Sequence, residues 1–258
     1  MRVLVKIIAI AFMAVSCVRG ASPVEIIPIQ DNPNPRVMSR SLFADAPDSL
    51  FSALGLQEGI PSSVCAFLVR IQGKNVLFDA ANGAPDSRLR YVLDSCGVAA
   101  EDVDLVFITH LHGDHIGGLL LEDKAAFPNA EVYINKVEYD AWMSMPESQS
   151  AKLRVISAAY NERLKTFSVN DELPCGVEAI AAYGHTPGHT AYKVENNLIA
   201  GDIMHGVALQ LHYPEYCARF DMDTAQSIMA RKNILQMAKD NHLTVYGMHF
   251  PYPYYLKF

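Results

Sequence analysis

The chain has 258 residues, half of them hydrophobic, so it can bury a full core within one sizeable domain. Its 28 acidic side chains outnumber the 21 basic ones, and this negative balance disfavours a nucleic-acid partner, because an acidic surface repels phosphates. The sequence contains no internal repeat and no low-complexity or linker-like segment, which excludes repeat architectures and argues against several separate domains.

The first twenty residues differ in composition from the rest. Arg2 and Lys6 precede an apolar run at residues 7–15, and small residues follow, as in a secretory signal peptide. The apolar run is shorter than a membrane-spanning helix requires. We therefore predict that residues 1–20 are a leader and that residues 21–258 form the mature domain, exported to the periplasm or the membrane surface of a bacterium. The alternative is a buried N-terminal strand or helix.

Two outcomes are open for the end of this leader, with cleavage after Ser16 or after Gly20. Cys17 stands where a bacterial lipoprotein carries its acylated cysteine, so a lipid anchor through Cys17 is one outcome. The other is an ordinary cysteine in a discarded leader. Without the three basic side chains of the leader, 18 basic residues stand against 28 acidic ones, a formal charge of −10.

The other four cysteines are Cys65, Cys96, Cys175 and Cys217. Their spacings match no zinc-ribbon pattern. An oxidising compartment permits disulfides among them, but the sequence does not give the pairing.

A segment ahead of the first predicted strand, residues 41–60, mixes polar residues with scattered large apolar ones. The apolar residues are Leu42, Phe43, Leu50, Phe51 and Leu54. One interpretation is an apolar lid over a site, and the other is an amphipathic helix packed on the core.

Short apolar runs rich in Val, Ile, Leu and Phe predict strands at residues 64–70, 76–78, 105–108, 132–134, 177–181 and 243–246. Helical patterns lie between them at residues 87–95, 136–143 and 150–164. A last helix is expected to about Asp240, with Asp223 as its N-cap and Gln226 reaching back to it. Strands and helices are interspersed along the whole chain, so the predicted class is mixed α and β (α+β).

Three of the nine histidines fall within the six residues His110-Leu111-His112-Gly113-Asp114-His115, directly after an apolar run. In extended backbone, residues i and i+2 point the same way, which aims His110 and His112 at one point. Gly113 lets the chain turn, bringing Asp114 and His115 toward a second point. Imidazole and carboxylate are ligands that Zn²⁺ accepts, but four ligands from one turn would surround a single ion only with strain. The pattern therefore predicts two adjacent metal ions.

This stretch resembles the signature of the metallo-β-lactamase superfamily, T-H-x-H-x-D-H, which matches residues 109–115. Three further motifs occur in the order of that family, at residues 184–190, 198–202 and 246–249. Upstream, residues 75–79 resemble the strand that ends in its structural aspartate, although Ala80-Ala81 stands where the family usually has Thr-Gly. The resemblance covers roughly residues 60–251. It implies a four-layer αβ/βα sandwich with the site at the loop edge between two sheets.

Carried over residue by residue, the resemblance implies two zinc ions per chain, with other divalent ions as an alternative. One ion would be bound by His110, His112 and His185, and the other by Asp114, His115 and His249, with Asp202 as the bridge. Asp79 is expected to accept a hydrogen bond from a ligand imidazole, and His189 to lie outside the ligand set. His205 has two open roles, one in lining the pocket or orienting a ligand and one purely structural. His212 and His242 are expected on the surface or in local packing.

Two residues distinguish this sequence from other branches of the family. Flavodiiron oxidoreductases carry Glu where His112 stands, so His112 favours a hydrolytic zinc site over di-iron redox chemistry. Two-zinc β-lactamases generally lack an aspartate at the position of Asp202, so Asp202 favours the lactonase and phosphotriesterase branches. The C-terminal third is spaced as in the methyl parathion hydrolase-like branch, which includes exported organophosphate hydrolases and quorum-quenching lactonases. Members of this family usually continue beyond the position of Phe258 through a final strand.

The sequence thus predicts an exported two-zinc hydrolase that attacks an ester, lactone or phosphotriester with a metal-bridging hydroxide. Asp114 is the candidate catalytic proton shuttle. The alternatives are a β-lactamase-type amide hydrolase and a non-catalytic metal-binding surface lipoprotein. The expected partner is a small-molecule substrate rather than nucleic acid, and a homodimer is left open.

Overall fold

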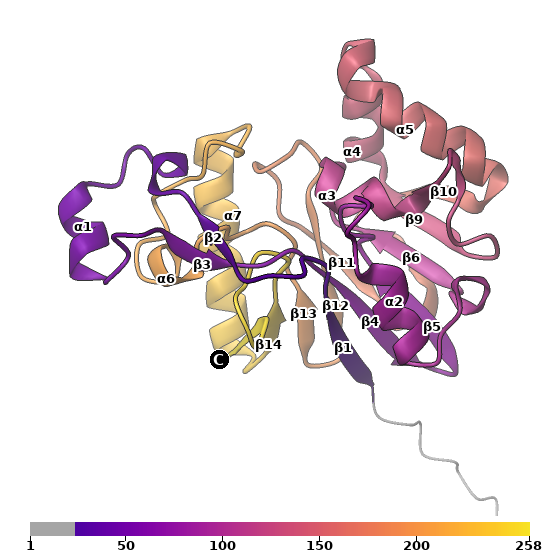
Figure 1. Ribbon diagram of the computed structural model, residues 1–258, viewed down its shortest axis with the longest axis horizontal. Helices are drawn as coiled ribbons and strands as arrows, with labels where there is room; N and C mark the ends of the chain where they lie inside the picture. The colour runs from indigo at the N-terminus through magenta and orange to yellow at the C-terminus, as the bar shows by residue number, and fades with distance from the viewer. Residues whose placement is uncertain (1–23) are drawn as a thin grey trace, which may run out of the picture.

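Two β-sheets form the centre of the protein, for which a computed structural model describes residues 24–258 (Figure 1). The predicted leader, with Cys17, lies outside the described residues. The first sheet has the order β1 (Glu25–Gln30), β4 (Cys65–Ile71), β5 (Lys74–Phe78), β6 (Leu105–Ile108), β9 (Glu131–Asn135) and β10 (Leu164–Phe167). The second has the order β11 (Glu178–Ala181), β12 (Thr190–Val194), β13 (Asn197–Ile199), β14 (Thr244–Tyr246) and β15 (Tyr255–Lys257). Two small ribbons pair β2 (Arg36–Met38) with β3 (Ile60–Ser62), and β7 (Leu120–Leu121) with β8 (Lys124–Ala125).

The central strands separate two hydrophobic cores, because successive side chains of a strand point to opposite faces. In β4, Phe67 and Val69 belong to the core that includes Tyr192 of the second sheet, whereas Ala66 and Leu68 belong to the core on the other face. Between the sheets, the rings of Phe78, Phe107 and Tyr192 lie with centroids 5.3–5.4 Å apart. This aromatic cluster joins the two sheets.

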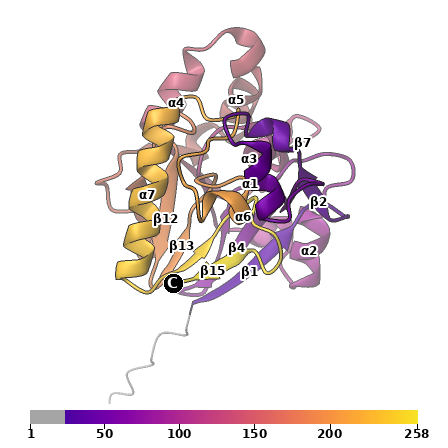
Figure 2. The same cartoon turned by 90° about the vertical axis from the view of Figure 1, so that its left-hand side faces the viewer.

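Helices cover the outer face of each sheet, which gives the four layers that the sequence predicts (Figures 1 and 2). Helices α2 (Leu89–Ser95) and α5 (Glu147–Tyr160) pack on the first sheet, and α7 (Thr224–Asp240) packs on the second. The face that α7 buries contains Arg231, Ile234, Leu235 and Ala238, the spacing of one helical stripe. The shorter helices are α1 (Asp48–Ala53), α3 (Gly113–Ile116), α4 (Lys136–Met143) and α6 (Val207–Gln210). Single 3₁₀ turns occur at Arg40–Leu42, Ala100–Asp102, Gly117–Leu119, Asn161–Arg163 and Pro174–Gly176.

All six predicted strands and all four predicted helices are present, with shifted ends for most of them. The helix predicted at residues 150–164 instead begins at Glu147 and ends at Tyr160, because Asn161 has a φ of 48° and β10 starts at Leu164. Asp223 caps α7 as expected, accepting from the backbone N–H of Gln226 at 2.9 Å and from its side chain at 2.7 Å. Several strands were not predicted, among them β1, β10, β12 and β15. Of these, β15 pairs antiparallel with β14, so a strand does follow the last motif.

The segment of residues 41–60 forms a small core of its own beside α6. Phe43, Phe51 and Ile60 are buried there with Leu209. Phe51 is only 2% exposed, so α1 is an amphipathic helix packed on a core, the second of the two interpretations of this segment. This core packs closely against Gly206, next to His205, since a Cβ at Gly206 would lie 2.8 Å from Ile60 and 2.9 Å from Phe43.

Two further expectations concern the membrane and the cysteines. In residues 24–258, no helix combines the length and the hydropathy that crossing a bilayer requires. Over the same residues, Cys65, Cys96, Cys175 and Cys217 are all unpaired.

Candidate metal centre

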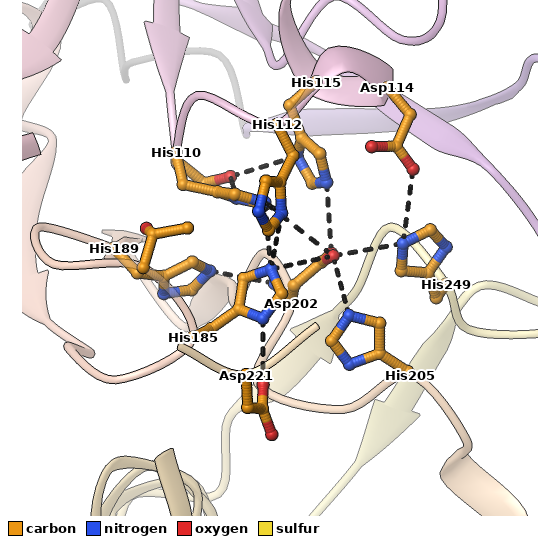
Figure 3. Close-up of polar contacts among 12 residues, drawn as sticks. His110, His112, Asp114, His115, His185, His189, Asp202, His205, Asp221 and His249 are labelled. Atoms are coloured by element: carbon orange, nitrogen blue, oxygen red, sulfur yellow. Dashed lines mark hydrogen bonds and ion pairs between the residues drawn. The ribbon is translucent and has the colours of Figure 1, made fainter. Parts of the chain in front are cut away.

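The predicted ligands follow directly after strands, at one edge of both sheets. Strand β6 ends just before residues 109–115, while β13 and β14 each end three residues before a ligand, Asp202 and His249. Because β5, β6 and β9 run parallel, and β13 runs parallel to β14, their carboxyl ends present loops at a common edge. Figure 3 shows that the seven predicted side chains converge there.

Three imidazoles form the first group. The Nε2 atom of His185 lies 3.1 Å from Nε2 of His110 and 2.9 Å from Nδ1 of His112, and the latter two atoms are 3.0 Å apart. Burial, and then the neighbouring imidazoles, lower the pKa of His110 well below its usual range and that of His112 to about 3. These two rings are therefore neutral at physiological pH and offer lone pairs to a shared cation.

Asp114, His115 and His249 form the second group, against the carboxylate of Asp202. His115 Nε2 lies 3.2 Å from Asp202 Oδ1, and His249 Nε2 lies 3.1 Å from Asp202 Oδ2 and 3.6 Å from Asp114 Oδ2. Burial opposes the charged form of both histidines, but Asp202 acts together with Asp79 on His115, and with Asp114 on His249, to outweigh it. The pKa of His115 therefore lies well above its usual range, and that of His249 is also raised. Positive charge is thus stabilised where a metal ion would lie.

Asp202 stands between the two groups. Its Oδ2 atom also lies 3.5 Å from Nε2 of His185 and 3.8 Å from Nε2 of His110. Burial raises the pKa of this carboxyl, but His249 and His115 lower it by more, so Asp202 is ionised.

Asp202 Oδ1 and His115 Nε2 are buried and lie 3.2 Å apart, but within residues 24–258 neither makes a hydrogen bond of good geometry. Unsatisfied buried polar atoms are rare in folded proteins and call for a missing partner. Nitrogen and carboxylate ligands in two adjacent groups are a donor set that Zn²⁺ accepts. The residues therefore fit two divalent cations that share Asp202.

Three of the ligand imidazoles, those of His115, His185 and His249, have their outer ring nitrogen held by a second residue, as is usual for imidazoles that bind metal. Nδ1 of His115 lies 2.8 Å from Asp79 Oδ2, so Asp79 has its expected place. Nδ1 of His249 donates to the carbonyl of Ser63 at 2.8 Å, and Nδ1 of His185 lies 2.9 Å from Asp221 Oδ1. These contacts fix which nitrogen of these three rings faces the centre.

Asp221 and Arg231 form a supporting pair to which the sequence motifs assign no role. Arg231 on α7 is fully buried, and its Nη2 donates to Asp221 Oδ2 at 3.1 Å. Asp221 thus links His185 to a buried guanidinium. Ten residues separate the pair, a spacing that carries no signal without the fold.

The remaining histidines divide as expected into buried and exposed ones. His189 Nε2 accepts from the backbone N–H of Asp202 at 2.9 Å, which places it behind the ligand set. The turn at Gly201 has a φ of 56°, and a Cβ there would lie 2.5 Å from His189, so glycine is required for this approach. His205 is buried with its Nε2 3.2 Å from Asp202 Oδ2, beside the centre. His212 and His242 are exposed.

A two-sheet sandwich between helices, with histidines and aspartates able to bind metal gathered at its loop edge, defines a class of metal-dependent hydrolases. The sequence profile described as the Metallo-beta-lactamase superfamily matches residues 59–249. The chain belongs to this superfamily, as its motifs predict.

Solved structures share the fold over nearly the whole chain. A hydrolase named AbOPH, described as a member of the beta lactamase superfamily, aligns with a TM-score of 0.79 and 27% identity, covering 91% of this chain and 89% of its own. AidC, a dizinc quorum-quenching lactonase in complex with a product, N-hexnoyl-L-homoserine, aligns with a TM-score of 0.80 and 22% identity, covering 92% and 90%.

Curated relatives match over shorter stretches. An N-acyl homoserine lactonase of Bacillus sp is 28% identical over 110 residues, which are 43% of this chain and 40% of that protein. A ribonuclease Z of Saccharolobus islandicus (strain L.S.2.15 / Lassen #1) is 39% identical over 70 residues, which are 26% of this chain and 22% of that protein. The chain thus spans well under half the length of the curated relatives it matches.

Proposed function

We propose that this protein hydrolyses the ester bond of a small-molecule lactone, with two divalent ions, zinc by preference, bound by the seven converging residues. The observation that carries the proposal is the place of Asp202, whose two oxygens lie 3.1–3.2 Å from His249 and His115 and within 3.8 Å of His110 and His185. A lactonase relative and a lactonase of the same fold support the substrate class.

The metal ligands are His110, His112, Asp114, His115, His185, Asp202 and His249. When bound, a pair of zinc ions supplies Lewis-acid activation of water and of the ester carbonyl. Asp114 and Asp202 offset only part of the positive charge, so the site attracts a carbonyl oxygen and stabilises the oxyanion that develops on attack.

Asp114 is the residue that we assign to proton transfer. It is only partly buried, and the charges of His115 and His249 overcome its burial and lower its pKa, so its carboxylate is ionised at neutral pH. In this role it accepts the proton of the attacking water and returns it to the departing alkoxide. Opening a lactone in this way gives a hydroxy acid and consumes one water molecule.

The test is a kinetic assay of the zinc-loaded protein on N-hexanoyl homoserine lactone, with an aryl ester, a paraoxon-type phosphotriester and nitrocefin alongside. We expect kcat/KM on the lactone of about 10⁴ M⁻¹s⁻¹ or more. A higher value on the phosphotriester or on nitrocefin would reassign the substrate class. Tight zinc binding with no turnover on any of them would favour the non-catalytic alternative.

The ribonuclease Z relative raises RNA cleavage as a second candidate, but nothing in the site favours it. The chain carries seven more acidic than basic residues, which disfavours binding to a phosphate backbone.

We also propose that the protein is exported, on the basis of its first twenty residues. Mass spectrometry of the protein recovered from a bacterial envelope fraction tests this. An N-terminus after Ser16 or Gly20, with or without a lipid on Cys17, supports export, and an intact leader on a cytoplasmic protein contradicts it.

A further inference from the structure

Helix α4 places one buried carboxylate between the two loops that carry the first group of imidazoles. Glu138 is 1% exposed. Its Oε1 accepts from the backbone N–H of Leu111 at 3.0 Å, and Leu111 lies between His110 and His112. Its Oε2 accepts from the hydroxyl of Thr186 at 2.8 Å and from the backbone N–H of Gly188 at 2.7 Å.

These contacts join segments that are far apart in the chain. Glu138 is 27 residues from Leu111 and 50 residues from Gly188. Gly188 is needed for the close approach, since a Cβ there would lie 2.2 Å from the backbone nitrogen of Glu138. A buried carboxylate is costly unless hydrogen bonds compensate it, and here three donors do so.

The position of Glu138 separates it from the ligands. Both of its oxygens are engaged by donors from the two loops, and it belongs to none of the groups of side chains close enough to share an ion. The second group of ligands is held by other contacts, His115 by Asp79 and His249 by the carbonyl of Ser63. Glu138 therefore acts on one half of the centre.

We propose that Glu138 is a positioning residue that fixes the distance between the loop of His110 and His112 and the loop of His185, and so sets the zinc affinity of this three-imidazole group. The inference rests on the metal centre of the proposed function and is independent of its substrate.

Glu138→Gln is the sharpest test, because the side chain keeps its size and loses one acceptor. Whichever way the amide turns, its NH₂ group faces the N–H of Leu111 or of Gly188. We expect the affinity for one of two zinc ions to fall by about 10- to 100-fold, the usual effect of removing such support. The affinity for the other ion should stay within about 3-fold. Titration of the full chain with zinc against a chromophoric chelator measures both.

The exposed Glu162 provides the matched control, and Glu162→Gln should keep both zinc affinities. Thermal unfolding with and without zinc separates positioning from a purely structural role. If Glu138 has a purely structural role, Glu138→Gln lowers the unfolding temperature of the zinc-free and the zinc-loaded protein equally. If Glu138 positions the ligands, the variant shows a smaller increase in unfolding temperature on zinc binding. Equal lowering with both affinities unchanged overturns the proposal.

Thr186→Val is the second variant, and it decides the matter if Glu138→Gln does not fold. It removes one of the three hydrogen bonds and keeps the shape of the side chain, so we expect a loss of affinity of about 2- to 10-fold for the same ion. Unchanged affinity in Thr186→Val would then overturn the proposal.

If the unaltered protein binds two zinc ions but opens no lactone, the substrate assignment fails while these titrations still test Glu138. If it opens lactones and the variants bind zinc normally, only the role of Glu138 fails.

Discussion

Five histidine nitrogens lie within 3.8 Å of the two oxygens of Asp202, those of His110, His115, His185, His205 and His249. A single buried carboxylate thus faces both groups of side chains. The raised pKa values of His115 and His249 favour protons beside this carboxylate in the metal-free protein, and we expect the proposed ions to replace them. The loss of this one side chain should therefore affect the site more than the loss of any supporting contact.

Asp202→Ala tests this view. Without the shared carboxylate the second ion loses a ligand, so we expect zinc content to fall from two ions toward one per chain and lactone turnover to fall by at least about 100-fold. Metal analysis of the dialysed protein, together with the lactone assay, measures both. Two tightly bound ions and full activity in the variant would show that Asp202 does not bridge.

Asp221 gives a second prediction for a single residue. Asp221→Ala leaves the buried Arg231 without its carboxylate, which should lower the free energy of unfolding by about 3–5 kcal/mol. Burial raises the pKa of Asp221, but the hydrogen bond from His185 and the charges of His205, His185 and Arg231 together lower it below its usual range. A depressed pKa means that the stabilisation is present at neutral pH and is lost as the pH falls below about 4. Urea unfolding at pH 7 and at lower pH measures this, and a loss below about 1 kcal/mol at pH 7 would contradict it.

Secondary-structure elements differ in how far the sequence could predict them. Helix α4 was predicted at its true bounds, and α7 was found from the capping pair of Asp223 and Gln226, because these signals are local. Strand β12 was not predicted because it includes Lys193 and begins at the last residue of a histidine motif, Thr190, so no long apolar run marks it. The end of α5 was placed too late, since the break at Asn161 depends on a positive φ that no glycine announces.

The packing of α1 leads to a prediction about stability. Phe51 is buried among Phe43, Ile60 and Leu209, so Phe51→Ala should lower the free energy of unfolding by about 3–5 kcal/mol. Chemical denaturation measures it. The exposed Val37 on β2 is the control, and Val37→Ala should change the stability by less than about 0.5 kcal/mol. If Phe51→Ala is as stable as the control variant, α1 does not pack as described.

For the whole molecule, the convergence of the ligands could be predicted from the order of four motifs, but the contacts that hold them could not. The carbonyl of Ser63 meets His249 across 186 residues, and Glu138 meets Gly188 across 50. Such pairs carry no local pattern, because only the packing of the two sheets brings them together. The motifs therefore specify which side chains converge, and the fold specifies the contacts that support them.

The unequal pKa values of the two groups lead to a prediction about zinc binding as a function of pH. The pKa of His115 lies well above its usual range and that of His249 is raised, so both rings favour a proton in the place of the cation in the metal-free protein. Zinc must displace it, so binding at this group should release protons and tighten as the pH rises. His110 and His112 have lowered pKa values and release none.

Calorimetric titration with zinc in buffers of different ionisation enthalpy counts the released protons. His249→Asn should release fewer protons than the unaltered protein. Binding of both ions without any proton release at pH 7 would contradict these assignments.

The most direct measurement is anomalous X-ray diffraction at the zinc edge from crystals of the zinc-loaded protein. We expect two peaks, one bound by nitrogens of His110, His112 and His185 and the other by those of His115 and His249, each at about 2.0–2.1 Å, with the carboxylate of Asp202 between them. A single peak, or a peak that none of these residues contacts, would contradict this expectation.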